Sequence, residues 1–329
     1  MNLHLSSPRR LLAAALAMAA CGLSSAYAQG DYPSRPIRLI VPFATAGVTD
    51  TSARIVAEKL SHELGQQVVV DNKPGAAGNI GTQMVANAEP DGYTLLLAYD
   101  GTLVINPNVY AKVPFDPVKD FAPIGKIGDA VLMVVVNPKV QATKLSELQA
   151  VAGTTPGGLS YGSAGTGSTT HLAGEMLKQR TGMPLVHVPY KGGGHAMGDV
   201  VSGVLPMNFT AVAGAMPFIR SKQIRPIAVA SRQRVASLPD VPTFIEAGLK
   251  DFEINSWVGL AAPARTPQPV LTKLNQALNK VLSTPELRER LGNLGIVAQP
   301  GTPAAFGQEI VRDLANNKAI VKAANIRID

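Results

Sequence analysis

Short apolar runs alternate with longer amphipathic segments through the first third of the chain. Apolar runs at residues 37–41, 68–70 and 93–98 predict strands. The segment that ends at Leu64 predicts a helix that opens near Thr49 or Asp50, both good N-caps, and residues 79–88 predict a second helix. Strands that alternate with helices in this way typically form a parallel sheet covered on both faces.

The rest of the chain repeats this alternation and then becomes helical. Strands are expected at residues 131–136, 159–163, 185–188, 205–209 and 227–230, with helices at 145–152, 169–180, 195–201, 215–222, 270–282, 285–294 and 303–322. We interpret Val131–Val136 and Ile227–Ala230 as crossings between two domains. The predicted fold class is therefore α/β, a two-domain fold with a cleft and two crossing hinge strands. Residues 29–130 and 228–329 would form domain 1, and residues 131–227 domain 2.

The N-terminus has the features of a secretory signal peptide. Arg9 and Arg10 precede an apolar run at residues 11–20, and Ala26-Tyr27-Ala28 is a small-x-small cleavage pattern. We expect cleavage after Ala28 and a soluble periplasmic product, because no later stretch is long and apolar enough to cross a membrane. Cys21, the only cysteine, leaves open a lipid anchor, and the mature chain has none for a disulfide.

Charge and spacing exclude several classes of function. The net charge is +7, and removal of Arg9 and Arg10 with the signal peptide leaves +5, which suits an anionic ligand. Basic residues are scattered, so no nucleic-acid partner is expected. The histidines show no metal-ligand spacing, and Gly162, Gly165 and Gly167 do not fit the dinucleotide-binding pattern. We therefore expect neither a metal nor a cofactor.

Two loops of small residues follow predicted strands and precede predicted helices. Such loops direct free backbone N–H groups and the positive end of a helix at an anion. The first loop comprises Phe43, Ala44, Thr45, Ala46 and Gly47, and the second comprises Ser163, Ala164, Gly165, Thr166, Gly167 and Ser168. The alternatives are structural: Ser168 caps a helix as readily as it binds, and Phe43 suits the core equally well. Asp100 is expected to be a solvated turn residue or, alternatively, a contact for a ligand hydroxyl or amino group.

Ordered motifs across the mature chain resemble one family. They include the segment PFATAGVTD, and the full set is Pro42–Asp50, Asn72–Asn79, Pro90–Leu95, Tyr161–Ser168 with His171–Leu172, Val188–Gly192, Leu238–Thr243 and Trp257–Ala264. The set is similar to that of the tripartite tricarboxylate transporter receptors, also called the Bordetella uptake gene (Bug) family. The resemblance implies a periplasmic solute-binding protein with a Venus-flytrap fold, which captures a small carboxylate-bearing organic acid for a membrane permease.

The resemblance also implies which residues bind the ligand. In addition to the two loops above, a loop formed by Tyr99, Asp100, Gly101 and Thr102 would contribute, and Tyr190 and Thr210 are further candidates. The chain departs from the family pattern at Ala46, usually Gly, at His195, often Pro, and at Thr210, often Asp. We expect a monomer that is not an enzyme.

Two other functions stay open. Ser168 or Ser163 is a candidate nucleophile of an exported hydrolase, although the chain has no G-x-S-x-G elbow. The receptor is alternatively the ligand-sensing subunit of a signalling system.

Overall fold

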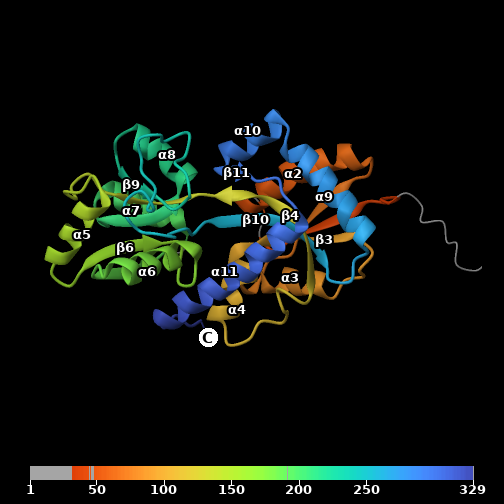
Figure 1. The fold of residues 1–329 in the computed structure, drawn as a ribbon, viewed down its shortest axis with the longest axis horizontal. Helices are drawn as coiled ribbons and strands as arrows, with labels where there is room; N and C mark the ends of the chain where they lie inside the picture. Colours follow the sequence, from red (N-terminus) through yellow and green to blue (C-terminus); the bar gives the residue numbers. More distant parts are fainter. Residues whose placement is uncertain (1–31, 44, 46–47, 191, 329) are drawn as a thin grey trace, which may run out of the picture. The chain divides into compact units, whose positions relative to one another are not determined.

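Two β-sheets, each flanked by helices, form the framework of the protein (Figure 1). The computed structural model describes residues 32–43, 45, 48–190 and 192–328. Residues 35–329 form a unit of their own, which contains both sheets. The predicted signal peptide, its cleavage site and the possible anchor at Cys21 lie outside the described residues.

The first sheet has six strands in the order β11-β4-β10-β3-β1-β2. Its strands are β1 (Ile37–Val41), β2 (Val68–Asn72), β3 (Thr94–Tyr99), β4 (Phe121–Ala130), β10 (Ser256–Pro263) and β11 (Ile296–Ala298). β1 is parallel to β2 and β3, whereas β10 is antiparallel to β3 and β4. Its helices are α2 (Val48–Leu64), α3 (Asn79–Ala86), α4 (Asn106–Val109), α9 (Gln268–Leu282), α10 (Pro285–Asn293) and α11 (Pro303–Ala323), with short turns at Ala76–Gly78 (η1) and Gly101–Ile105 (η2).

The second sheet has five strands in the order β7-β6-β8-β5-β9 and occupies the left of Figure 1. Its strands are β5 (Leu132–Val136), β6 (Leu159–Ser163), β7 (Leu185–Pro189), β8 (Met207–Ala211) and β9 (Arg225–Val229). Its helices are α5 (Leu145–Thr154), α6 (Thr169–Thr181), α7 (Gly193–Ser202) and α8 (Val212–Arg220). We refer to the first sheet with its helices as lobe 1, and to the second as lobe 2.

The chain passes between the two sheets at two places. β4 leads directly into β5, and β9 returns to β10 through residues 230–255. The apolar pattern predicted β5 and β9 but missed β4, β10 and β11. β4 was missed because Lys126 and Asp129 interrupt its apolar pattern, and the two side chains lie 2.6 Å apart as an ion pair. The predicted domain boundaries at residues 130/131 and 227/228 stay a prediction.

Local details also differ from the sequence-based expectations. α2 begins at Val48, so Asp50 lies in its first turn rather than capping it. There its carboxylate still favours the positive helix end and lies 3.0 Å from Arg54. In lobe 2, α6 lies close to β6 because residue 174 is glycine: a Cβ there would be 2.1 Å from the Tyr161 ring.

Candidate functional site

The loops that follow β1 and β3 contact one another. The Phe43 and Tyr99 rings meet edge to face, with centroids 5.2 Å apart. Gly78 in η1 fits beside them only because it lacks a side chain: a Cβ would lie 2.7 Å from Thr102 Oγ1 and 3.1 Å from the Phe43 ring. Thr102 in turn donates a hydrogen bond to the carbonyl of Ala77 at 3.4 Å. The carboxyl ends of β1 and β3 thus form one surface, as expected for ligand-binding edges of parallel sheets.

Polar side chains from β2 and α2 form hydrogen bonds that hold the first loop in place. Asn72, at the end of β2, donates to the Phe43 carbonyl at 3.0 Å and to Asp50 Oδ1 at 2.9 Å. Arg54 neutralises Asp50 and donates to the Asn72 side chain as well. Thr45 is exposed, whereas the predicted contacts Ala44, Ala46 and Gly47 lie outside the described residues.

Asp100 is buried, so the expectation of a solvated turn residue was wrong. Its side chain connects three elements: Oδ1 accepts from Ser256 in β10 at 2.7 Å, and Oδ2 accepts from Thr169 in α6 at 2.6 Å. The second of these bonds joins lobe 1 to lobe 2. Burial raises the pKa of Asp100 from 3.8 to about 7, although these hydrogen bonds oppose the shift. The neighbouring Gly101 faces the Tyr99 ring, 2.6 Å from where its Cβ would lie.

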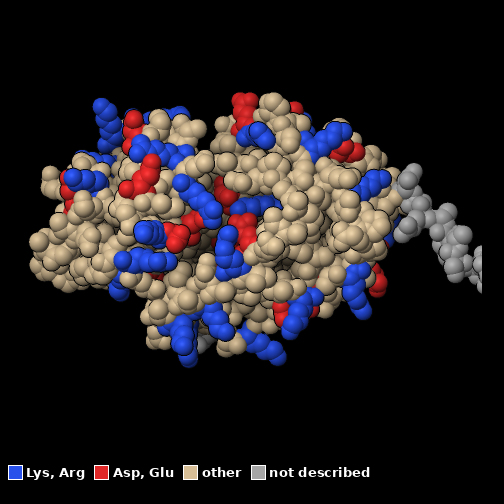
Figure 2. All heavy atoms as spheres, in the orientation of Figure 1, with Lys and Arg blue, Asp and Glu red and all other residues tan. Residues whose placement is uncertain are grey.

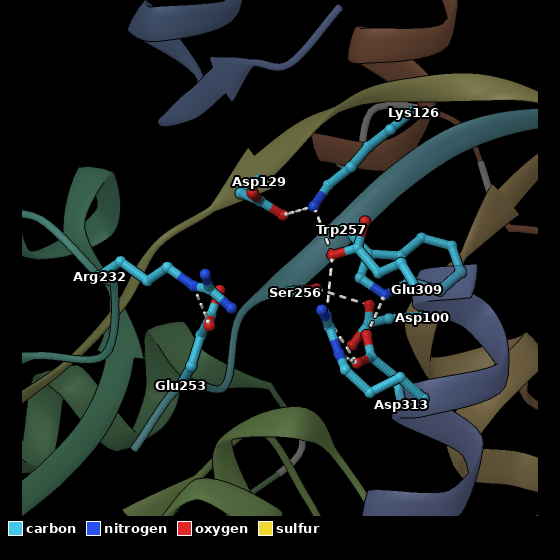
Figure 3. A network of polar contacts seen from close by, with 10 residues as sticks. Asp100, Lys126, Asp129, Arg232, Glu253, Ser256, Trp257, Glu309 and Asp313 are labelled. Atoms are coloured by element: carbon cyan, nitrogen blue, oxygen red, sulfur yellow. Dashed lines mark hydrogen bonds and ion pairs between the residues drawn. The ribbon is translucent and has the colours of Figure 1, made fainter. Parts of the chain in front are cut away.

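A charged network lies on strands β4 and β10 of lobe 1 (Figure 3). Lys126 in β4 contacts Asp129 at 2.6 Å and Glu309 of α11 at 2.7 Å. The two carboxylates outweigh the effect of burial and raise the pKa of Lys126, whereas burial raises the pKa of Asp129 to about 6. Trp257 in β10, the only tryptophan of the chain, is buried and donates through Nε1 to Asp313 of α11 at 3.0 Å. This network fixes α11 to both β4 and β10.

Two cavities adjoin this network, and Figure 2 shows acidic and basic side chains gathered in the hollow there. The larger has a volume of about 1240 Å³ and includes none of the predicted ligand-binding residues. The smaller, of about 320 Å³, includes Asp100 and its partner Thr169. Only the smaller cavity therefore reaches a predicted ligand-binding residue.

The second predicted loop lies at the end of β6 and forms hydrogen bonds both within itself and to the first turn of α6. Gly165 has φ +134°, a conformation that favours glycine, and its N–H donates to Ser163 Oγ at 3.1 Å. Ser168 caps α6 by accepting from the His171 N–H, and its own N–H donates to the Gly165 carbonyl. Ala164 donates to the Thr170 hydroxyl at 2.9 Å.

Thr166 differs from the rest of this loop. It is exposed, and neither its N–H nor its hydroxyl has a hydrogen-bond partner among the described residues. Gly167, the next residue, has φ +74° and approaches lobe 1, where a Cβ would lie 2.8 Å from Ile328. Thr166 is therefore the donor that the folded loop leaves available.

Two histidines, His171 and His187, contact this loop. Gly167 N–H donates to His171 Nδ1 at 3.0 Å, and Ser163 Oγ lies 2.7 Å from His187 Nε2. His171 follows Ser168 by three residues, and His187 pairs with Tyr161 in the sheet. Only the strand register, which the sequence does not state, brings His187 to Ser163.

The remaining candidate ligand-binding residues are Tyr190 and Thr210. Tyr190 donates from its hydroxyl to Asp199 Oδ2 at 2.6 Å, and its carbonyl lies 3.2 Å from where a Gly165 Cβ would be. Thr210 is buried in β8, where it pairs with Met133 of β5. Among the described residues, no cluster of metal-ligating side chains occurs. Nor is any helix in that part of the chain long and apolar enough to span a membrane.

Comparison with known proteins places the chain in a family. The model of the tripartite tricarboxylate transporter family receptor matches residues 52–326. The structure of the periplasmic binding protein BugD is 35% identical, with a TM-score of 0.73 over 90% of this chain and 99% of that one.

Two further structures are similar in fold and contain acids. Rpa4515 of Rhodopseudomonas palustris with adipate is 32% identical, with a TM-score of 0.77 over 90% of this chain and 99% of that one. MatC of the same organism with bound malate is 30% identical, with a TM-score of 0.73 over 88% of this chain and all of that one. These likenesses confirm the predicted periplasmic binding protein fold. The chain belongs to the tripartite tricarboxylate transporter family of receptors.

Proposed function

We propose that this receptor binds a small carboxylate-bearing organic acid between its lobes and delivers it to the membrane permease of a tripartite transporter. Support comes from similar receptors whose structures contain adipate and malate, both dicarboxylates. The observation that carries the proposal is the meeting of the loops: those after β1 and β3 adjoin, and Asp100 hydrogen-bonds to Thr169, next to the loop after β6.

The proposed ligand contacts are neutral donors rather than buried cations. In lobe 2, the N–H and hydroxyl of Thr166 have no partner in the part of the chain that the structure describes, and they are suited to a carboxylate oxygen next to the N-terminus of α6. In lobe 1, exposed Thr45 and the wall formed by Phe43 and Tyr99 would contact the rest of the acid. Neutral donors bind an anion without an ion pair, which keeps release to a permease feasible.

A ligand titration tests the proposal. Thermal unfolding of the purified protein is followed with malate, adipate, citrate, glutamate and benzoate, because an acid that binds the folded state raises Tm with its concentration. Gly165→Leu should abolish the shift, since Gly165 has φ +134° and a Cβ would press on the Tyr190 carbonyl. An unchanged shift in this variant would remove the loop from the site.

A matched glycine controls for backbone strain. Gly157 also has a positive φ, of +77°, and precedes β6 at the far end from the loop, with no atom near its Cβ position. Gly157→Leu should lower Tm through strain but leave the ligand-induced shift intact. If no acid raises the Tm of the unaltered protein, the proposed ligand class is wrong.

Export to the periplasm and a role as a non-enzymatic monomer belong to the same proposal. The N-terminal motif ending at Ala28 supports export. N-terminal sequencing of the protein from the periplasmic fraction tests cleavage after Ala28, and sedimentation tests the monomer.

One observation favours the hydrolase alternative. Ser163 Oγ lies 2.7 Å from His187 Nε2, a geometry that resembles a nucleophile and its base. Against it, Ser163 is fully buried and its hydroxyl also bonds to Gly165, and no carboxylate among the described residues orients His187. Hydrolysis of an ester by the protein, lost in Ser163→Ala, would support this alternative.

A further inference from the structure

Two imidazole rings connect α6 to the second sheet at the base of the Ser163–Ser168 loop. His171 comes from the first turn of α6, and His187 comes from β7. Their ring centroids are 3.6 Å apart, and the ring planes deviate from parallel by only 10°. The rings are therefore stacked, so a shift of one would displace the other.

The stack has a fixed location because its surroundings are tightly packed. The Tyr161 ring lies 5.1 Å from His187, and the Tyr161 hydroxyl donates to Glu175 Oε1 at 2.8 Å. Gly174 allows this approach, since any Cβ there would collide with Tyr161. Helix and sheet thus hold the two rings between them.

Both rings are neutral at pH 7. Burial, with a smaller effect from His187, lowers the pKa of His171 to about 3, and burial lowers the pKa of His187 to about 4. A neutral imidazole has one acceptor nitrogen, and in His171 this is Nδ1, because it accepts the Gly167 N–H. Protonation of His171 would remove that acceptor, and protonation of both rings would place two positive charges on rings whose centroids are 3.6 Å apart.

Each ring is hydrogen-bonded to one end of the loop. His187 contacts Ser163 at its start, and Ser163 Oγ accepts the Gly165 N–H. His171 accepts the Gly167 N–H near its end. The amides on either side of Thr166 are therefore turned toward the protein, whereas the Thr166 N–H and hydroxyl have no partner among the described residues.

We propose that His171 and His187 are positioning residues for ligand binding: as a neutral stack they hold the Ser163–Ser168 loop in the conformation that presents Thr166 to a carboxylate. The role rests on the proposed function, because it concerns the same site. Neither histidine contacts the acid; each acts through the backbone of the loop. The hydrogen-bonding nitrogen, rather than the ring, is the essential part of each side chain.

Paired substitutions separate the nitrogen from the ring. In His171→Asn the side-chain amide places an acceptor near the position of Nδ1, and in His187→Gln near that of Nε2, whereas Phe keeps a stacked ring without an acceptor. With malate and adipate as calorimetric probes, His171→Phe and His187→Phe should bind at least about fivefold more weakly than the unaltered protein, the effect of one lost hydrogen bond. The Asn and Gln variants should bind within about twofold of it.

A second readout needs no acid. Amide hydrogen exchange of Gly167 should be slow in the unaltered protein and in His171→Asn, and faster in His171→Phe. Nitrogen NMR of ¹⁵N-histidine-labelled protein at pH 7 should show His171 neutral, with its proton on Nε2.

Specific results would overturn the positioning role. They are Phe variants that bind like the unaltered protein, Asn and Gln variants as weak as the Phe variants, or a proton on His171 Nδ1. If the unaltered protein binds neither malate nor adipate, the proposed ligand class loses support. In that case exchange at Gly167 and the state of His171 still decide whether the stack positions the loop.

Discussion

Replacement of Asp100 by Asn should alter how the stability of the protein depends on pH. The folded-state pKa of Asp100 is about 7, raised by burial from 3.8, which we take for the unfolded chain. The folded state therefore binds the proton more tightly than the unfolded chain, so protonation of Asp100 stabilises the folded state. This contribution to stability is fully present below the unfolded-state pKa and is lost as the pH rises through 7.

The magnitude follows from the two pKa values. At pH 5 the proton contributes about 3 kcal/mol to the free energy of unfolding, and at pH 8 it contributes almost nothing. The side chain introduced by Asp100→Asn would be neutral throughout, and its amide can still hydrogen-bond to the hydroxyls of Thr169 and Ser256. Between pH 5 and pH 8 the wild-type protein should thus lose about 3 kcal/mol of its free energy of unfolding relative to Asp100→Asn.

Urea unfolding of both proteins at pH 5, 6, 7 and 8 measures this difference. Other buried carboxyl groups, such as Asp129, are present in both proteins, so their effects largely cancel. Asp240→Asn, which alters an exposed carboxylate, is the matched control. Its free energy of unfolding, plotted against pH, should run parallel to that of the wild type. If the Asp100→Asn curve is also parallel to the wild type, the carboxyl group is not held neutral by burial and the reasoning is refuted.

Two further substitutions test the packing of the Ser163–Ser168 loop and the ion pairs of Lys126 in β4. Gly167→Ala should cost about 1–2 kcal/mol in the free energy of unfolding, because φ is +74° and the new Cβ would press on Ile328. Gly153→Ala, in helix α5 with open space around it, should instead be neutral or stabilising by up to about 1 kcal/mol. Equal effects of the two substitutions would contradict this account. Lys126→Met should cost about 3 kcal/mol at pH 7.5, since it leaves the buried carboxylate of Asp129 without its cation and Glu309 with Arg312 alone. Lys119→Met, at an exposed pair, should cost less than about 0.5 kcal/mol. Urea unfolding compares the two variants, and a small loss in both would show that the ion pairs of Lys126 contribute little.

The alternation of apolar runs and amphipathic segments determined much of the fold. The strands predicted at 37–41 and 159–163 and the helices predicted near 270–282 and 303–322 are observed as β1, β6, α9 and α11. These segments are recognisable because each buries one continuous face, which the spacing of apolar residues reports directly. The glycines of the second loop were likewise informative, since positive φ angles at Gly165 and Gly167 require that residue type.

Only the tertiary structure determined which polar groups are satisfied. Asp100 has the sequence context of a solvated turn, yet Thr169 and Ser256, both distant in the chain, bury it and bond both its oxygens. β4 was not recognised for the same reason, since its Lys126 is paired with Glu309 of α11, a helix far along the chain. Hydrophobic burial follows from local periodicity, whereas the pairing of polar groups depends on contacts between segments that the sequence keeps far apart. This is why the sequence predicted the loops of the site but not the histidine stack that holds one of them.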